Sequence, residues 1–275
     1  MRTRAAVTIL AVSLAPCLLA LGGCTRDYRV ASKFEDAAEA LREGDPDTAA
    51  DYYYDAFQVD ATGPRAPEAL YAYAYTTDFH QKSPALAAEF YRRVVRLFPQ
   101  SPRAKDALER AATIENTILG HPERAVLDYQ RLAELFPDSE KRAEWAMATA
   151  QCYLNLGNAA QAEQEVRALL SQGEKLAIEG RIRAHHLLGK IYLVQERPAE
   201  AVHVFEELCR MLEGNPAQHA AWLEARFQLA QALTDVDETE RALEVYRQIE
   251  GEFPRQEIIQ EKINFLTIRQ QKRSR

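Results

Sequence analysis

The side chains that could do chemistry in this chain are six histidines, four cysteines and 41 carboxylates. Their spacing matches no H-E-x-x-H pair, no phosphate-cradling glycine loop and no G-x-S-x-G turn. His185 and His186 are adjacent, and adjacent helical residues point about 100° apart, which disfavours a shared metal ion. The carboxylates recur at helical salt-bridge spacing, as on a solvated surface. We therefore expect no catalytic residues, no metal site, no cofactor and no small-molecule substrate.

The charge balance points away from nucleic acid. Lys and Arg number 34 against 41 Asp and Glu, which gives a formal net charge of −7. A protein that binds nucleic acid needs a basic stripe to neutralise phosphates, and none is apparent here. We therefore expect no nucleic-acid partner.

One stretch shows how the elements are organised. The run Leu188–Tyr192 reads L-G-x2-Y, and Ala201 and Phe205 follow it as A-x3-F. Gly189 has no side chain, so a neighbouring helix can approach closely at that point. Ala201 allows the same approach on a second helix, and Phe205 one turn later can fill the space between the two helices. The spacing predicts a helical hairpin.

The hairpin pattern recurs six times. Its key small residues are Ala49, Ala87, Ala125, Ala162, Ala201 and Ala242. Each is followed four residues later by an aromatic or aliphatic residue. Proline precedes four of the alanines by three residues, and glycine precedes three of them by five, as expected where a second helix begins and a first helix ends. The spacing resembles that of tetratricopeptide repeats.

This resemblance implies an all-α fold, a right-handed superhelix (α-solenoid) of six tetratricopeptide-like hairpins over residues 31–254. Residues 255–275 are expected to form a capping helix with a basic tail, because a solenoid must cover the apolar face of its last repeat. Gly189 and the six key alanines are the expected packing positions.

The N-terminus has the features of an export signal. Residues 1–4 are basic, residues 5–21 are apolar, and the run ends in Leu21-Gly22-Gly23-Cys24. These four residues resemble a bacterial lipobox, which implies cleavage after residue 23, lipidation of Cys24 and a short lipidated tether over residues 24–30. Without residues 1–23 the charge is 32 − 41 = −9, because Arg2 and Arg4 are lost. An ordinary secreted protein cleaved after Gly23 is the alternative.

Two repeats share a more specific sequence motif. Phe98-Pro99-Gln100-Ser101 recurs one repeat later as Phe136-Pro137-Asp138-Ser139. This form resembles the lipoprotein D component of the β-barrel assembly machinery and the Tol-Pal-associated cell-division coordinator. The resemblance implies an outer-membrane protein, lipid-anchored and facing the periplasm, since Thr25 rather than Asp follows the cysteine. The pilotins of type IV pili share the lipobox and the helices, so the alternative is a pilotin-like role or a role in coordinating Tol-Pal and cell division.

Binding residues are indicated only on the first helices of the hairpins. Arg183, His186 and Lys190 lie at i, i+3 and i+7, on the face expected to line a concave groove. By resemblance to peptide-binding members of the family, they could hold a peptide carboxylate; three solvated side chains are the alternative. In the second repeat, Tyr71, Ala72 and Tyr75 match the Leu, Gly and Tyr slots, which places Tyr73 on the same groove face.

Two cysteines remain after Cys17 leaves with the signal and Cys24 takes the lipid. Cys152 falls on a first helix and Cys209 on the second helix of the next repeat, positions that do not pack together in this architecture. We expect two buried free thiols. Taken together, the chain is predicted to be a non-catalytic, membrane-anchored scaffold that binds other proteins, and the resemblance implies components of outer-membrane β-barrel assembly among them.

Overall fold

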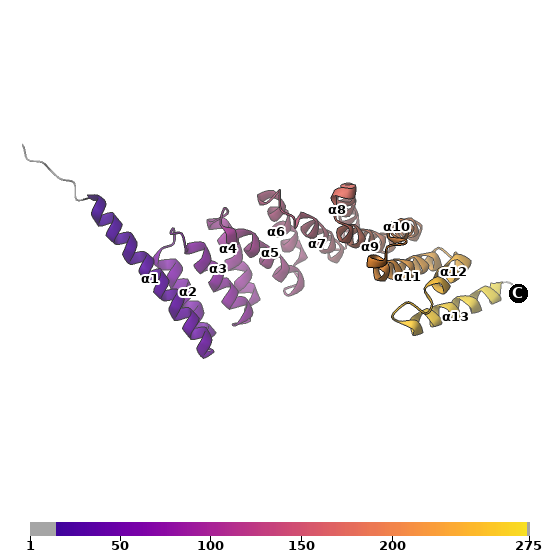
Figure 1. Cartoon of the computed structure of the whole chain (residues 1–275), viewed down its shortest axis with the longest axis horizontal. Helices are drawn as coiled ribbons and strands as arrows, with labels where there is room; N and C mark the ends of the chain where they lie inside the picture. The colour runs from indigo at the N-terminus through magenta and orange to yellow at the C-terminus, as the bar shows by residue number, and fades with distance from the viewer. Residues whose placement is uncertain (1–14, 274–275) are drawn as a thin grey trace, which may run out of the picture. The chain divides into compact units, whose positions relative to one another are not determined.

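The fold is all-α, and within each of the two compact units described below the helices pack in sequence (Figure 1). The computed structural model describes the backbone of residues 15–273 and the side chains of residues 25–272. Within that part, thirteen α-helices follow one another. They are α1 Ala15–Glu43, α2 Pro46–Val59, α3 Ala66–Phe79, α4 Pro84–Leu97, α5 Pro102–Thr117, α6 Pro122–Leu135, α7 Arg142–Asn155, α8 Ala159–Leu170, α9 Ile178–Val194, α10 Pro198–Leu212, α11 His219–Asp235, α12 Thr239–Ile249 and α13 Gln256–Arg273.

Proline starts the second helices where the sequence predicts it. Helices α2, α4, α6 and α10 each begin at a proline, because the missing N–H lies at a position that has no helical acceptor. Side chains satisfy the next donors. Asp45 accepts a hydrogen bond from the Thr48 amide at 3.1 Å, and Asn158 accepts one from the Gln161 amide at 3.2 Å.

The turn inside every hairpin contains one left-handed residue. It lies five positions before the key alanine in all six cases. Glycine occupies three of these turns, and Lys82, Glu196 and Asp237 occupy the others with φ of 56°, 59° and 67°. Side chains are strained in this region, so the turn geometry overrides local preference at these three positions.

The small residues form the contact points between helices. All six key alanines are fully buried. A Cβ built at Gly189 on α9 would lie 2.3 Å from Cζ of Phe205 on α10. Phe205 is itself buried, so no side chain larger than hydrogen fits at position 189 without moving the ring.

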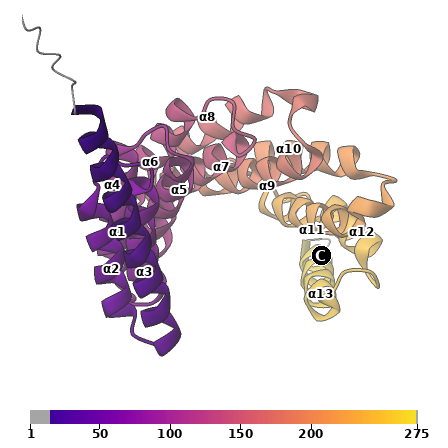
Figure 2. The same cartoon turned by 60° about the vertical axis from the view of Figure 1, so that its left-hand side comes forward.

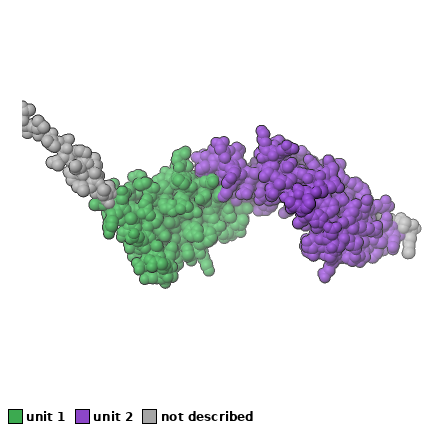
Figure 3. Space-filling view, in the orientation of Figure 1, with its two compact units in different colours: residues 1–120 green, residues 121–275 purple. Residues whose placement is uncertain are grey.

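The chain divides into two compact units, residues 1–120 and 121–275 (Figure 3). Unit 1 contains α1 to α5, and guanidinium groups bridge its helices. Arg103 of α5 makes two hydrogen bonds to Glu68 of α3, at 2.6 and 2.7 Å. Arg110 makes two more to the buried Asp78, at 2.6 and 3.1 Å. Paired, planar contacts of this kind orient α5 against α3.

The register of α3 differs from the prediction by two residues. Ala69, Leu70, Ala74, Thr76 and Thr77 are fully buried, and of these Leu70, Ala74 and Thr77 have the spacing of His185, Gly189 and Tyr192 on α9; Tyr71 is half-buried and Tyr75 is exposed. The Leu, Gly and Tyr slots therefore belong to Tyr73, Ala74 and Thr77. The sequence match to Tyr71, Ala72 and Tyr75 was wrong, because it read aromatic residues as core and overlooked a small threonine at the packing position.

Unit 2 contains α6 to α13 (Figure 2). Its core is continuous through α12 to the last helix, where Ile259, Ile263 and Leu266 of α13 are buried. Helix α13 thus covers the end of the repeat core. Cys152 and Cys209 are free and buried, as predicted.

Helix α1 begins at Ala15, so residues 24–30 have a helical backbone. The tether expected there is a continuation of the first helix. Most of the expected signal, residues 1–14, and the Cys24 side chain lie outside the described residues. Among the helices that the structure describes, none combines the length and apolarity needed to cross a membrane.

Candidate protein-binding surfaces

The predicted basic row on α9 comprises Arg183, His186 and Lys190. Arg183 is exposed, and its Nη2 atom lies 3.8 Å from Oε1 of Glu144 on α7. Lys190 is also exposed. Arg183 therefore has an acidic neighbour, which leaves less charge for a ligand than three free cations would offer.

His186 lies differently from the two residues beside it. It is half-buried, and its ring centroid is 6.2 Å from that of Phe205 on α10. Burial holds the pKa of His186 below its usual value, although Glu224 on α11 opposes that shift. The neutral ring is thus favoured, and His186 acts mainly as a packing residue.

Tyr73 is not a groove residue in the structure. Its ring lies 4.5 Å from that of Phe90 on α4 and 5.2 Å from that of Tyr54 on α2. Arg93 lies over the rings of Tyr54 and Phe90, 5.9 and 5.5 Å from their centroids. Tyr73 is therefore part of an aromatic cluster that fills the space between α2 and α4, a correction that follows from the two-residue shift in register.

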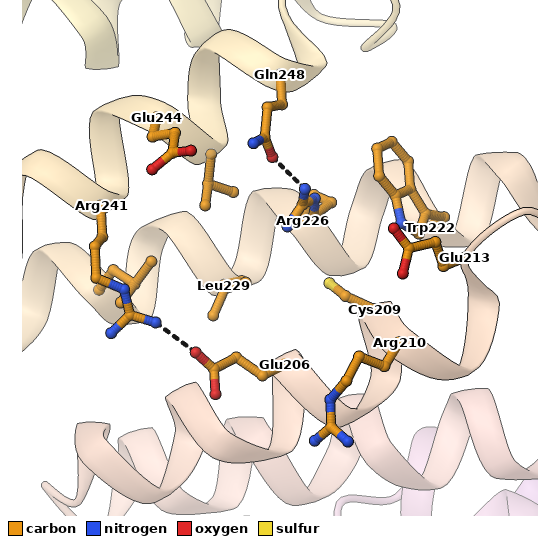
Figure 4. Close-up of a pocket in the computed structure, with 12 residues that line it drawn as sticks. Glu206, Cys209, Arg210, Glu213, Trp222, Arg226, Leu229, Arg241, Glu244 and Gln248 are labelled. Atoms are coloured by element: carbon orange, nitrogen blue, oxygen red, sulfur yellow. Dashed lines mark hydrogen bonds and ion pairs between the residues drawn. The ribbon is translucent and has the colours of Figure 1, made fainter.

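A cavity of about 320 Å³ lies in unit 2 between α10, α11 and α12 (Figure 4). We call it the junction cavity. Three sets of side chains line it, and each set spans about two or three turns of one helix, with members one, three or four residues apart, so that one side of each helix contributes. The sets are Glu206, Cys209, Arg210 and Glu213 of α10, Trp222, Arg226, Leu229 and Leu233 of α11, and Arg241, Glu244, Val245 and Gln248 of α12.

The floor of the junction cavity is apolar. Leu229, Leu233 and Val245 are buried and line the cavity together with Cys209, which Figure 4 shows near Leu229. Burial raises the pKa of the Cys209 thiol to about 11. The thiol is therefore protonated at neutral pH and acts as a small apolar group, since the thiolate is the reactive form.

Charged side chains of both signs form the rim, three arginines and three glutamates. The Arg226 guanidinium lies 5.0 Å above the Trp222 ring and donates a hydrogen bond to Gln248. Its Nε atom is buried and has no hydrogen-bond partner within the described residues. Arg241, by contrast, is paired with both Glu206 and Glu238. A buried N–H without an acceptor costs about 1–3 kcal/mol, so Arg226 is the group that would gain most from a ligand oxygen.

A second hollow of about 500 Å³ adjoins the junction cavity and shares Glu213 and Trp222 with it. Pro216 and His219 complete one side. The His219 ring stacks on Trp222 with centroids 5.7 Å apart and planes 17° apart, while its Nε2 lies 2.9 Å from Glu252. Trp222 therefore separates two adjoining hollows and presents ring surface to both.

The junction cavity has no recognisable pattern in the sequence. Its residues follow ordinary helical core spacing, and the hollow exists because Cys209 and Val245 are small where three helices meet. No group of three or more His, Cys, Asp and Glu side chains suited to a metal ion occurs in the portion of the chain that the structure covers. The chemistry on offer is apolar contact, ring stacking and charge-assisted hydrogen bonding, which together suit a peptide.

Sequence comparison identifies tetratricopeptide repeats in part of the chain. The tetratricopeptide repeat model matches residues 35–102 and 119–177, which end before α9, and the helices continue beyond them to α13. The matched residues have the repeat of a family whose arrays bind other proteins. No curated protein matches it in sequence.

Solved structures share the architecture at low identity. PilW, described as a widely conserved type IV pilus biogenesis factor, is 16% identical with a TM-score of 0.52, over 86% of this chain and 98% of that one. A putative kinesin light chain from Podosopora anserina is 18% identical with a TM-score of 0.54, over 73% and 97%. A chain from the structure of Naa15/Naa10 bound to HypK-THB is 15% identical with a TM-score of 0.62, over 94% and 36%. These likenesses concern the fold alone.

Proposed function

We propose that this chain is a non-catalytic scaffold, anchored to the bacterial outer membrane through lipid on Cys24, that binds proteins of envelope assembly. The main support is the junction cavity, a hollow in a tetratricopeptide array with an apolar floor and an unpaired buried Nε on its rim. The lipobox-like residues Leu21–Cys24 and the repeated Phe-Pro-x-Ser motif support a location in the cell envelope.

The junction cavity defines the ligand by its chemistry. Cys209, Leu229 and Val245 would receive an apolar side chain. A carboxylate next to it would accept hydrogen bonds from Arg226, at the buried Nε that now lacks an acceptor. Charge-assisted bonds of this kind contribute about 1.5–3 kcal/mol where water is excluded. The ligand is thus a protein segment that carries an acidic residue beside an aliphatic or aromatic one.

Site-specific crosslinking tests the binding surface. A photo-reactive residue at Arg210, on the exposed rim, is expected to give an adduct in intact cells, and one at exposed Arg247 on α12 is not. Arg226→Gln should reduce the Arg210 adduct at least tenfold, about 1.4 kcal/mol in binding. Arg183→Glu with Lys190→Glu should leave it unchanged. An adduct lost only in the α9 double variant would move the interface to that row.

The anchor is tested independently. Cys24→Ser should release the protein from membranes and remove the mass of the acyl chains, whereas Cys17→Ser should change neither. A Cys24→Ser protein that stays in the membrane fraction at unaltered mass would exclude lipidation at this residue.

A pilotin-like role is the second candidate. It is favoured by the likeness to PilW, which covers nearly the whole of that chain. The identity of the crosslinked protein separates the candidates: a β-barrel assembly component indicates the assembly role, a secretin the pilotin role, and a Tol-Pal component the division role.

A further inference from the structure

The last helix has two apolar faces. One face carries the buried Ile259, Ile263 and Leu266, which pack against the repeat core. On the opposite side, Phe265 and Ile268 are 59% and 54% exposed. A helix that only closes a solenoid should present a polar outer face. The apolar residues on the outer face of α13 therefore suggest that another protein surface covers them.

The exposed face has a defined pattern. Glu261, Phe265, Ile268 and Lys272 are all exposed and are spaced by four, three and four residues. At about 100° per residue they fall within about 60° of the helix circumference. We call these four residues the α13 stripe. The spacing is that of a two-helix coiled-coil seam, with an apolar centre and a charge of opposite sign at each end.

The α13 stripe is complementary to itself. Its midpoint lies between Phe265 and Ile268, and Glu261 and Lys272 are equally far from it, about 8 Å along the helix at 1.5 Å per residue. A second copy placed antiparallel about this midpoint sets Phe265 against the partner's Ile268 and Glu261 against the partner's Lys272. Two-fold symmetry repeats both contacts, as an isologous interface requires.

We propose that two copies of this protein associate through their α13 stripes as an antiparallel helix pair. Within the described residues, neither Glu261 nor Lys272 has an ion-pair partner in its own chain, so both charges are available. One helix pair buries less area than a standard interface, so the dimer is reversible and depends on concentration. This association is independent of ligand binding at the junction cavity.

Charge reversal provides the test, with the full chain followed by sedimentation velocity from about 1 to 100 µM, the range in which weak dimers dissociate. Glu261→Lys and Lys272→Glu each place like charges together twice in a homodimer, and each should raise the dissociation constant at least about tenfold. An equal mixture of the two variants should restore association, because each Lys then meets a Glu. Phe265→Ser should also weaken the dimer while keeping both charges.

Glu250→Lys is the control, since it makes the same charge change at an exposed residue away from the stripe. It should associate as the unaltered chain does. A protein that stays monomeric throughout this concentration range would overturn the proposal. So would a dimer that resists both reversals, or a mixture that associates no better than the single variants.

Discussion

The junction between repeats 1 and 2 and the junction between repeats 5 and 6 are built from side chains at four equivalent positions of the repeat, but one junction is filled and the other is hollow. Two of these positions lie five and eight residues after the key alanine of the first repeat. The third directly precedes the buried alanine of the next helix, and the fourth lies three residues after the key alanine of the second repeat. In unit 1 they carry Tyr54, Phe57, Tyr73 and Phe90; in unit 2 they carry Glu206, Cys209, Leu229 and Val245.

Side-chain volume decides the outcome at each junction. The aromatic rings of unit 1 lie 4.5–6.1 Å from one another and fill the space between α2 and α4. The smaller residues of unit 2 leave the junction cavity, with Gln248 at the position that Arg93 occupies in unit 1. A repeat array can thus convert a packing site into a binding hollow by changing a few side chains, because the small-residue contacts hold the helices in place.

The small-residue contacts should tolerate the least change. Gly189→Leu is expected to lower the free energy of unfolding by more than about 3 kcal/mol, because even a Cβ would lie 2.3 Å from Phe205 Cζ. Arg247→Leu, an exposed change on α12, should stay within about 0.5 kcal/mol. Chemical denaturation measures both; similar midpoints for the two variants would show that the contact at Gly189 is loose.

Emptying the filled junction should cost somewhat less. Tyr73→Leu with Phe90→Val gives unit 1 the residues of unit 2 and should lower stability by about 2–3 kcal/mol, from lost burial and an unfilled space. Tyr28→Leu, at an exposed residue of α1, is the control. If the double variant is as stable as the unaltered chain, the aromatic cluster is not the reason that the two junctions differ.

Filling the open junction should affect binding more than folding. Val245→Phe introduces the aromatic residue of unit 1 and should reduce the Arg210 crosslink at least tenfold, about 1.4 kcal/mol. Stability should change by less than about 1 kcal/mol, since the ring enters existing space. Arg247→Phe adds the same ring at the surface and should leave crosslinking intact. Undiminished crosslinking with Phe at 245 would mean that the ligand does not enter the cavity.

The turns give the smallest contrast between the units. Unit 2 carries Glu196 and Asp237 in left-handed turns, whereas two of the three turns in unit 1 carry glycine. Glu196→Gly should raise the free energy of unfolding by about 0.5–1 kcal/mol, because glycine removes the steric cost of positive φ. Gly157→Ala should lower it by at least about 1 kcal/mol. Thermal melts of both variants check the sign, and a loss of stability in Glu196→Gly would contradict the turn assignment.

The regular features of the fold could be read from the sequence because they depend on short-range patterns. Alanines about 38 residues apart, with proline and glycine at constant offsets, indicate paired helices, and the helices begin at the predicted prolines. The burial of Cys152 and Cys209 and the apolar inner face of α13 follow from the same periodicity. These features need only the geometry of one hairpin and its neighbour.

The sequence could not decide which spaces between helices are filled. The sequence pattern places Tyr73 on the groove face because two registers of α3, two residues apart, match the repeat almost equally well, and the burial of Ala74 and Thr77 in the structure selects the other register. His186 packs near Phe205 instead of facing solvent for a similar reason, because a rotation of about half a turn around the helix axis separates solvent-facing positions from core-facing ones. The junction cavity depends on the summed volumes of side chains from α10, α11 and α12. The summed volume of side chains from three helices leaves no short-range pattern in the sequence. Only the tertiary structure therefore determines where a cavity forms between the helices.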